Sequence, residues 1–340
     1  MPTLYLNSQG VDARLNDRRV ALSRFDYAND DVDAFKVPIF DIDRVVVIGT
    51  PRVSMQLLHK FMYANIPVYF LSTHGRWVSS MVPNSNGSAL RRLRQYEAAR
   101  SATLAVMIAR QLVYAKIRNM RRVLQRLAAN REQSQDLEQM DACNSLLGYA
   151  QKVMDADAVD AIRGYEGIAS ACYFRRLGAF FPEDLPFTSR SRRPPRDAAN
   201  AILSWTYTIV GAEIDAEIRC AGLDPCLGFL HDISYGRPSL ALDLVEPLRA
   251  PLCDLLALNL LNHKLLKKEH FENHADDGGV YLKSDSRKIF FCEYEQYMER
   301  FFAESKGGSR VTFRRVIRNM VNAISQTVES NQEPQFFMMP

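Results

Sequence analysis

The first eighty residues alternate between short hydrophobic runs and polar turns, which is the pattern of a β-rich region. Residues 3–6 and 19–22 are strand candidates separated by turns that contain Gly, Asn and Asp. Residues 44–48 form a β-branched run before a glycine, which is typical of a buried strand. Residues 54–64 carry apolar positions at helical spacing, and residues 66–71 return to a strand pattern. We therefore predict a small β domain with one helix.

The pattern changes to helical periodicity after a stretch rich in Pro, Asn, Ser and Gly at residues 82–88. Apolar residues then recur at steps of three and four, as at Leu104, Met107, Ile108 and Leu112. The chain is therefore predicted to be an α+β protein with three parts: a small N-terminal β-rich domain at residues 1–82, a linker at 83–90 and a larger all-α domain at 91–340.

Composition is that of a soluble globular protein. Of the 340 residues, 47% are hydrophobic and 24% are charged, which is ordinary for folded domains. No apolar run approaches the roughly 18–20 residues of a membrane span, and the N-terminus lacks the features of a signal peptide. The six cysteines form no CxxC pair, which favours reduced thiols over a zinc or disulfide framework. We expect a cytoplasmic protein with no membrane partner.

One predicted helix carries only positive charge, although the net charge of the chain is a modest +4. Between Ser101 and Arg131 there is no acidic residue, and the basic residues are Arg110, Lys116, Arg118, Arg121, Arg122, Arg126 and Arg131. A solvated helix face normally mixes both signs, whereas a one-signed face favours a polyanion. The pattern predicts contact with phosphates, and a merely soluble basic face is the alternative.

A candidate metal site lies in residues 226–249. His231 follows a short apolar run, and Asp243 and Glu246 lie three residues apart on a predicted helix that Ser239 would cap. Positions i and i+3 share a helix face, so the two carboxylates are expected to project together. One imidazole and two carboxylates suit Mg²⁺ or Mn²⁺. The alternative is a core histidine beside an ordinary capped helix.

Glu166 is a candidate for the further anionic ligand that such a site needs. It lies among small residues at a predicted helix start, where another helix or a nucleic-acid backbone can approach closely. A carboxylate in such apolar surroundings is costly unless it is paired or metal-bound. A capping or surface glutamate is the alternative.

Taken together, these motifs resemble the universal integrase-endonuclease family of CRISPR spacer acquisition. The motifs are Arg163-Gly-Tyr-Glu166-Gly, Gly228-Phe-Leu-His231 and Ser239-Leu-Ala-Leu-Asp243-Leu-Val-Glu246. The resemblance extends over almost the whole chain, including the β-rich domain and the last helix with Phe313-Arg314. It implies that Glu166, His231 and Glu246 are metal ligands and that Asp243 is the nearby acidic residue needed for activity. The last ligand is often Asp in the family and is Glu here.

The resemblance also implies the partners and the reaction. The family forms homodimers through the β-rich domain, and two dimers are bridged by the small second CRISPR-associated adaptation protein. The substrates would be double-stranded DNA with free 3′ ends and the repeat DNA. The expected function is that of a metal-dependent DNA endonuclease and integrase, which inserts short foreign fragments (spacers) into the CRISPR array by phosphodiester transfer, in antiviral defence.

The DNA backbone is expected to contact Arg110, Arg118, Arg121, Arg122, Arg126, Arg193 and Arg314. Two other readings of the sequence are possible. One is a non-catalytic architectural DNA-binding protein, in which Glu166 and His231 are core groups. The other is a His-Asp phosphohydrolase, suggested by His231-Asp232, although that class has a different order of ligands along the chain.

Overall fold

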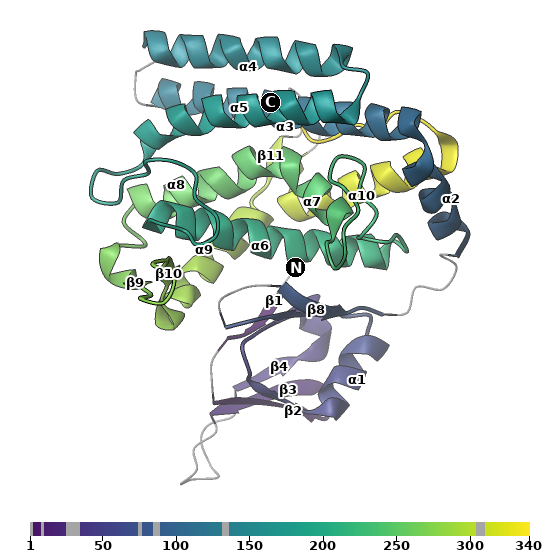
Figure 1. Cartoon of the computed structure of the whole chain (residues 1–340). Coiled ribbons are helices and arrows are strands. Elements are labelled where there is room, and N and C mark those ends of the chain that lie inside the picture. The colour runs from purple at the N-terminus through teal and green to yellow at the C-terminus, as the bar shows by residue number, and fades with distance from the viewer. Residues whose placement is uncertain are drawn as a thin grey trace. The chain divides into compact units, whose positions relative to one another are not determined.

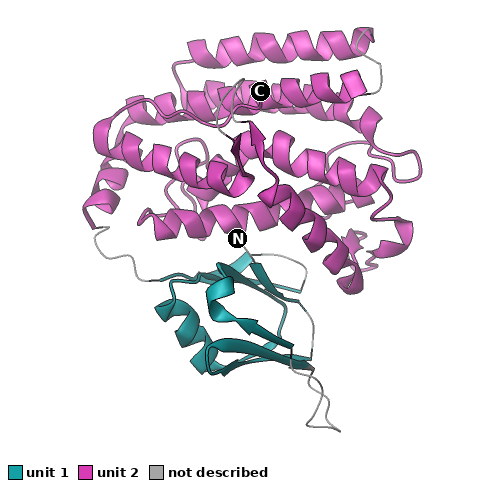
Figure 2. Ribbon diagram, turned by 180° about the vertical axis from the view of Figure 1, so that it is seen from behind, with its two compact units in different colours: residues 1–86 teal, residues 87–340 magenta. Residues whose placement is uncertain are grey.

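The computed structural model describes residues 3–7, 10–24, 35–73, 77–83, 89–130, 136–303 and 310–340. It divides into two compact units, residues 1–86 and 87–340 (Figure 2). The first unit is β-rich and the second is mostly helical, so the predicted fold class is confirmed. Most of the predicted linker, residues 84–88, lies outside the described residues.

The first unit contains two four-stranded sheets. One has the order β1 (Thr3–Leu6), β5 (Arg44–Ile48), β7 (Val68–Leu71) and β8 (Trp77–Met81). The other has the order β4 (Phe35–Pro38), β3 (Arg19–Arg24), β2 (Val11–Asn16) and β6 (Arg52–Val53). β5 pairs in parallel with both β1 and β7, which explains why its residues are apolar on both faces.

Helix α1 (Met55–Tyr63) crosses this unit and begins at a side-chain cap. The backbone N–H of Leu57 donates to Ser54 Oγ at 3.3 Å. Leu57 and Phe61 from the helix join Val20 and Val45, from the two different sheets, in one buried cluster. The core of the unit is therefore shared by both sheets and the helix.

The second unit is built from helices of very different lengths (Figure 1). Its helices are α2 (Ala89–Arg100), α3 (Ala102–Asn130), α4 (Leu137–Asp155), α5 (Val159–Leu177), α6 (Ala198–Cys220), α7 (Ser239–Val245), α8 (Leu255–Asn262), α9 (Arg287–Glu299) and α10 (Phe313–Ser330). Two short antiparallel pairings join β9 (Phe271–Asn273) to β10 (Val280–Leu282) and β11 (Phe302–Ala303) to β12 (Arg310–Val311).

Helix α3 is central to this unit, although its sequence predicted a basic face that contacts phosphates. It packs against α4 and α5 and also against the turns that follow α7. Ile108, Leu112, Ile117 and Leu124 are fully buried. The basic residues of this helix therefore differ in exposure: Lys116 is buried, Arg110 and Arg121 are half-buried, and Arg118, Arg122 and Arg126 are exposed.

The segment after α7 leaves regular α-helical geometry twice before α8 begins. A 3-10 turn spans Glu246–Leu248, and a π-helical turn spans Arg249–Asp254. Pro247 and Pro251 lie in these turns and have no N–H to donate, which is incompatible with an unbroken helix. These turns carry several of the charged groups of the candidate site.

Within the described part of the chain, no helix is both long enough and apolar enough to cross a membrane.

Candidate metal centre and nucleic-acid interface

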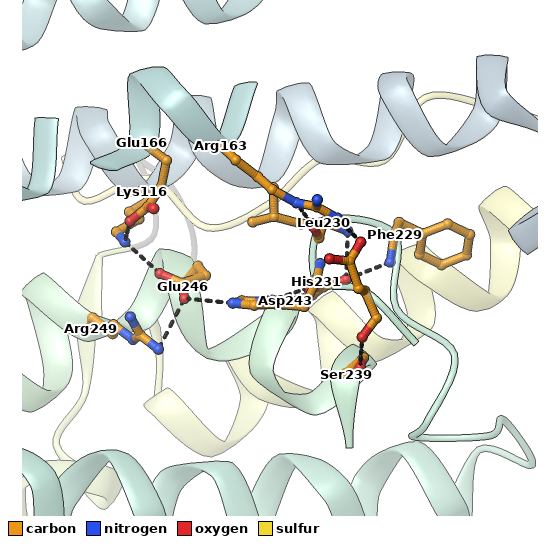
Figure 3. Close-up of polar contacts among 11 residues, drawn as sticks. Lys116, Arg163, Glu166, Phe229, Leu230, His231, Ser239, Asp243, Glu246 and Arg249 are labelled. Atoms are coloured by element: carbon orange, nitrogen blue, oxygen red, sulfur yellow. Dashed lines mark hydrogen bonds and ion pairs between the residues drawn. The ribbon is translucent and has the colours of Figure 1, made fainter. Parts of the chain in front are cut away.

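Three separate segments bring the candidate ligands into one region (Figure 3). Glu166 comes from α5, His231 from the loop before α7, and Glu246 from the 3-10 turn after α7. The His231 Nε2 and Glu246 Oε1 atoms lie 3.8 Å apart, and only 3% of the Glu246 side chain is exposed. Glu166 reaches Glu246 through a third residue, Lys116 of α3.

Lys116 forms ion pairs with both glutamates. Its ammonium Nζ lies 2.6 Å from Glu246 Oε2 and also contacts Glu166 Oε1, and the lysine side chain is only 2% exposed. From the sequence, Lys116 was one of the basic residues of a helix expected to contact phosphates, and its buried position between the glutamates was not predicted. A signal was present, because Lys116 follows Leu112 by four residues and precedes Met120 by four, on the apolar stripe of α3.

Asp243 lies behind His231 and is completely buried. It accepts hydrogen bonds from the backbone N–H groups of Phe229, Leu230 and His231 at 2.6, 3.0 and 2.9 Å. Its Oδ1 atom is also 2.7 Å from His231 Nδ1. A carboxylate acceptor at this distance assigns the imidazole proton to Nδ1 and leaves Nε2 free to accept a proton or bind a cation.

Asp243 and Glu246 project together toward the same histidine. Helix α7 ends at Val245 and Glu246 begins the 3-10 turn, and the two carboxylates approach opposite nitrogens of the His231 ring. The predicted cap is wrong. Pro238 is the N-cap residue, and the Ser239 hydroxyl donates to the carbonyl oxygen of Asp232 at 2.7 Å.

The loop before α7 is fixed on both sides. At Gly228 an added Cβ would lie 2.8 Å from the Cβ of Ser239 and 2.9 Å from Asp243 Oδ2, so only glycine fits here. Arg163 of α5 donates from Nε to the carbonyl oxygen of Leu230 at 2.6 Å and also pairs with the Asp232 carboxylate. These contacts hold the backbone of His231 between α5 and α7.

Behind Glu246, a further set of largely buried polar groups begins at Arg249. Arg249 Nη2 lies 2.9 Å from Glu246 Oε1, and the guanidinium is 5.0 Å from the centre of the Tyr207 ring. The hydroxyl groups of Tyr207 and Tyr173 donate to the two oxygens of Asp254 at 2.6 and 2.9 Å. The two tyrosines of this set were not predicted, because Tyr173 and Tyr207 lie far from Glu246 in the chain, whereas Arg249 follows Glu246 by three residues.

The pKa values of three carboxyl groups in and beside the site are shifted. Burial opposes ionisation of Glu166, but the Lys116 ammonium outweighs it and lowers the pKa of the carboxyl to about 2. Burial likewise opposes ionisation of Glu246, yet Arg249 and Lys116 lower its pKa. At Asp254 burial dominates over the tyrosine hydrogen bonds and raises the pKa to about 6. Glu166 and Glu246 are therefore charged at neutral pH and attract a cation.

The donor set suits a hard divalent ion, because it offers two charged carboxylates and one imidazole nitrogen. The Lys116 ammonium between the glutamates demonstrates that a cation is stabilised at this position. Among the described residues, no three His, Cys, Asp or Glu side chains are arranged to hold one metal ion in this conformation. A metal ion shared by both glutamates therefore requires a rearrangement around Lys116.

The arginines expected to bind DNA fall into three groups. Arg118, Arg122 and Arg126 are exposed at successive turns of α3, and Arg193 is exposed in the loop before α6. The side chains of Arg110 and Arg121 are half-buried, and they donate to the carbonyl oxygens of Ala156 and Cys143 at 2.6 and 3.1 Å.

Arg314 forms the third group, and its assignment to the DNA interface is wrong. Its side chain is only 5% exposed, and it forms ion pairs with Glu213, Glu295 and Glu299 at 3.4, 2.5 and 2.5 Å. Three carboxylates around one buried guanidinium leave no charge for a phosphate to neutralise. Arg314 therefore joins α10 to α6 and α9.

Comparison with known proteins gives a consistent result. The family model described as CRISPR associated protein Cas1 matches residues 4–296. A curated relative from Thermodesulfovibrio yellowstonii, named CRISPR-associated endonuclease Cas1 1, is 32% identical over 303 residues, which is 88% of this chain and 92% of the relative.

Two solved structures share the fold over the whole chain. A Cas1 protein from Thermotoga maritima has a TM-score of 0.80 and 23% identity, and all of both chains is covered. A casposase bound to its integration product has a TM-score of 0.85 and 22% identity, covering 100% of this chain and 94% of that one.

Proposed function

The chain belongs to the Cas1 family of CRISPR-associated endonucleases, and from that premise we propose that it is a metal-dependent DNA endonuclease and integrase. It would insert short foreign DNA fragments into a CRISPR array by phosphodiester transfer. The observation that carries this proposal is the convergence of Glu166, His231 and Glu246, with Asp243 fixing the imidazole.

Glu166, His231 and Glu246 would hold Mg²⁺ or Mn²⁺. Bound there, the ion would supply Lewis-acid chemistry to a phosphate group of the DNA. Asp243 keeps the Nδ1 proton of His231 in place, so Nε2 stays available as a donor atom. Arg249 adds a buried positive charge beside Glu246, where negative charge on a phosphate would be stabilised.

Two other partners are part of the proposal. The β-rich unit would form the homodimer, and it carries exposed apolar side chains suited to an interface, including Phe40 and Tyr63 at 83% and 85% exposure. The small second CRISPR-associated protein would bridge two dimers. If replacing both Phe40 and Tyr63 by serine leaves the sedimentation coefficient of the dimer unchanged, the interface lies elsewhere.

A strand-transfer assay tests the activity. Purified protein, with and without its small partner, is mixed with a short duplex that has free 3′ ends, a repeat-bearing plasmid and Mg²⁺ or Mn²⁺. We expect joined product from the wild type and none from His231→Ala. His263→Ala is the matched control, because His263 is exposed and distant in sequence, and it should join DNA like the wild type. DNA binding without joining or cleavage under either metal would instead support the architectural reading.

A further inference from the structure

The Lys116 ammonium lies in the space that a shared metal ion would need. Each of its two ion pairs uses one oxygen of a proposed ligand: Oε1 of Glu166 and Oε2 of Glu246. A divalent ion held by the same oxygens at about 2.0–2.6 Å would lie within a few ångströms of Nζ. Two cations so close repel strongly where water is scarce, so they do not share these oxygens.

Lys116 is also too well enclosed to be an incidental surface pair. Its side chain is only 2% exposed, and a buried ammonium is costly unless it is paired. Conversely, the two glutamates without Lys116 would be like charges held close together, with Arg249 as the remaining partner of Glu246. The lysine therefore stabilises the site when no divalent ion is bound.

The second oxygen of Glu246 faces the histidine. Glu246 Oε1 lies 3.8 Å from His231 Nε2, and Arg249 Nη2 lies 2.9 Å from the same oxygen. Of the two glutamates, Glu166 is the one in contact with water, because its side chain is 25% exposed and that of Glu246 is 3% exposed. Apart from Lys116, its Oε1 atom accepts a hydrogen bond from Ser170 Oγ at 2.7 Å, so Glu166 is the ligand with the fewer buried contacts to break.

We propose that Lys116 is an internal counter-cation of the metal site, which holds Glu166 and Glu246 together in the metal-free protein and is displaced from Glu166 when a divalent ion binds. This inference rests on the proposed function, because it takes these glutamates as ligands. Lys116 is then a positioning residue that sets the metal affinity, since every binding event must break an existing ion pair.

Lys116→Met tests the inference, because methionine has a similar length and no charge. Binding of Mn²⁺ is measured by electron paramagnetic resonance, and the melting temperature is measured with EDTA and with Mn²⁺. We expect Mn²⁺ affinity to rise about tenfold, because the competing cation is gone. The melting temperature in EDTA should fall, and Mn²⁺ should raise it more than in the wild type.

Lys116→Arg is the matched control, and it should not bind Mn²⁺ more tightly than the wild type because it keeps the charge. An unchanged affinity in Lys116→Met would overturn the inference, while His231-dependent strand transfer by the wild type would still support the proposed function. If neither protein binds Mn²⁺ and the wild type does not join DNA, the proposed function itself fails.

A measurement on the wild type covers the case in which Lys116→Met does not fold. Lysines are acetylated with a soluble ester and counted by mass spectrometry, with exposed Lys288 as the internal reference. We expect Lys116 to react slowly in EDTA and several times faster with saturating Mn²⁺. Equal rates in the two conditions would show that the metal does not displace Lys116 and would overturn the inference.

Discussion

Asp243 determines which nitrogen of His231 faces the glutamates. It is fully buried, and both of its oxygens are occupied by N–H donors of the loop that carries His231. This is the geometry in which an outer carboxylate fixes the orientation and tautomer of a metal-binding histidine. We therefore expect the residue to act through His231, because N–H groups of the loop already occupy both of its oxygens.

Asp243→Asn is expected to weaken metal binding and strand transfer by about 10–100-fold. The amide N–H₂ group cannot accept the loop N–H bonds, and the negative charge that holds the Nδ1 proton is lost. Mn²⁺ affinity and the rate of joining are the two measurements. Asp184→Asn is a control at an exposed position, because Asp184 lies exposed in a turn between α5 and α6. Wild-type metal affinity in Asp243→Asn would contradict the positioning role.

Asp254 provides a prediction about stability and pH. Its pKa is raised from 3.8 to about 6 by burial, so the folded state holds this proton more tightly than the unfolded state. The stabilising contribution is complete below about pH 4 and is lost as the pH rises through 6. The shift of about two pKa units corresponds to about 3 kcal/mol.

Asp254→Asn should therefore gain stability relative to the wild type as the pH rises from 4 to 7. The asparagine side chain does not ionise, so no buried negative charge forms as the pH rises. Its amide can still hydrogen bond to the hydroxyl groups of Tyr173 and Tyr207. Urea unfolding at several pH values gives the difference in free energy of unfolding. A difference that is constant across this range would mean that Asp254 titrates normally.

At the scale of elements, the local pattern of apolar residues predicted the regular helices and strands. It failed to predict burial where tertiary contacts determine which faces are covered. The β-branched run at residues 44–48 is a buried strand because parallel neighbours cover it, and the periodic run after residue 101 is a helix. The same periodicity could not reveal that α3 is covered on several sides. That covering is what turns Lys116 from a surface charge into a partner of two glutamates.

The candidate site was recognised from short motifs, but its supporting groups were not. His231, Asp243 and Glu246 are close in sequence, and Arg249 follows Glu246 by three residues, whereas Lys116 acts through pairings that only the fold creates. Arg314 shows the opposite error, because a basic residue on an amphipathic helix lies among three acidic side chains from α6 and α9. Charge in a sequence does not specify which charges face water.

The C-terminal segment is an element that the sequence left undefined. Residues 331–340 have no regular secondary structure, yet Phe336 and Phe337 are buried. Fully buried Asn119 of α3 donates to the carbonyl oxygens of Phe337 and Pro247 at 2.9 and 2.7 Å, and its Oδ1 accepts from the N–H of Met339 at 2.7 Å. One side chain thus links the segment to the residue next to Glu246.

Removing residues 332–340 is expected to destabilise the protein by several kcal/mol. The deletion exposes the apolar surface that Phe336 and Phe337 cover, and it leaves the buried Asn119 side chain without two of its hydrogen-bond partners. Strand transfer should fall with it, since Pro247 loses a support. The melting temperature and the joining rate are the measurements. Met338→Ala is the control, because Met338 is 46% exposed, and it should behave like the wild type. A truncated protein of unchanged stability would contradict this view of the segment.

At the scale of the whole molecule, the proposed DNA binding would depend on local groups of basic residues, because the net charge of +4 is too small to act alone. Arg118, Arg122 and Arg126 recur every four residues along α3 and are exposed. This spacing corresponds to about 6 Å along the helix axis, so each guanidinium can approach a different phosphate. Contacts of this kind are independent of sequence and weaken with salt.

The salt dependence of binding counts these contacts directly. Affinity for a duplex with free 3′ ends should fall steeply between 50 and 200 mM salt, with a slope of about −0.9 per phosphate contacted. Replacing Arg118 and Arg126 by glutamine should make the plot of log affinity against log salt concentration shallower, by about the slope that two phosphate contacts contribute. Lys288→Gln removes an exposed charge from α9 and should leave the slope unchanged. If the double variant keeps the wild-type slope, α3 does not follow the DNA backbone, and the exposed charge elsewhere on the protein must account for binding.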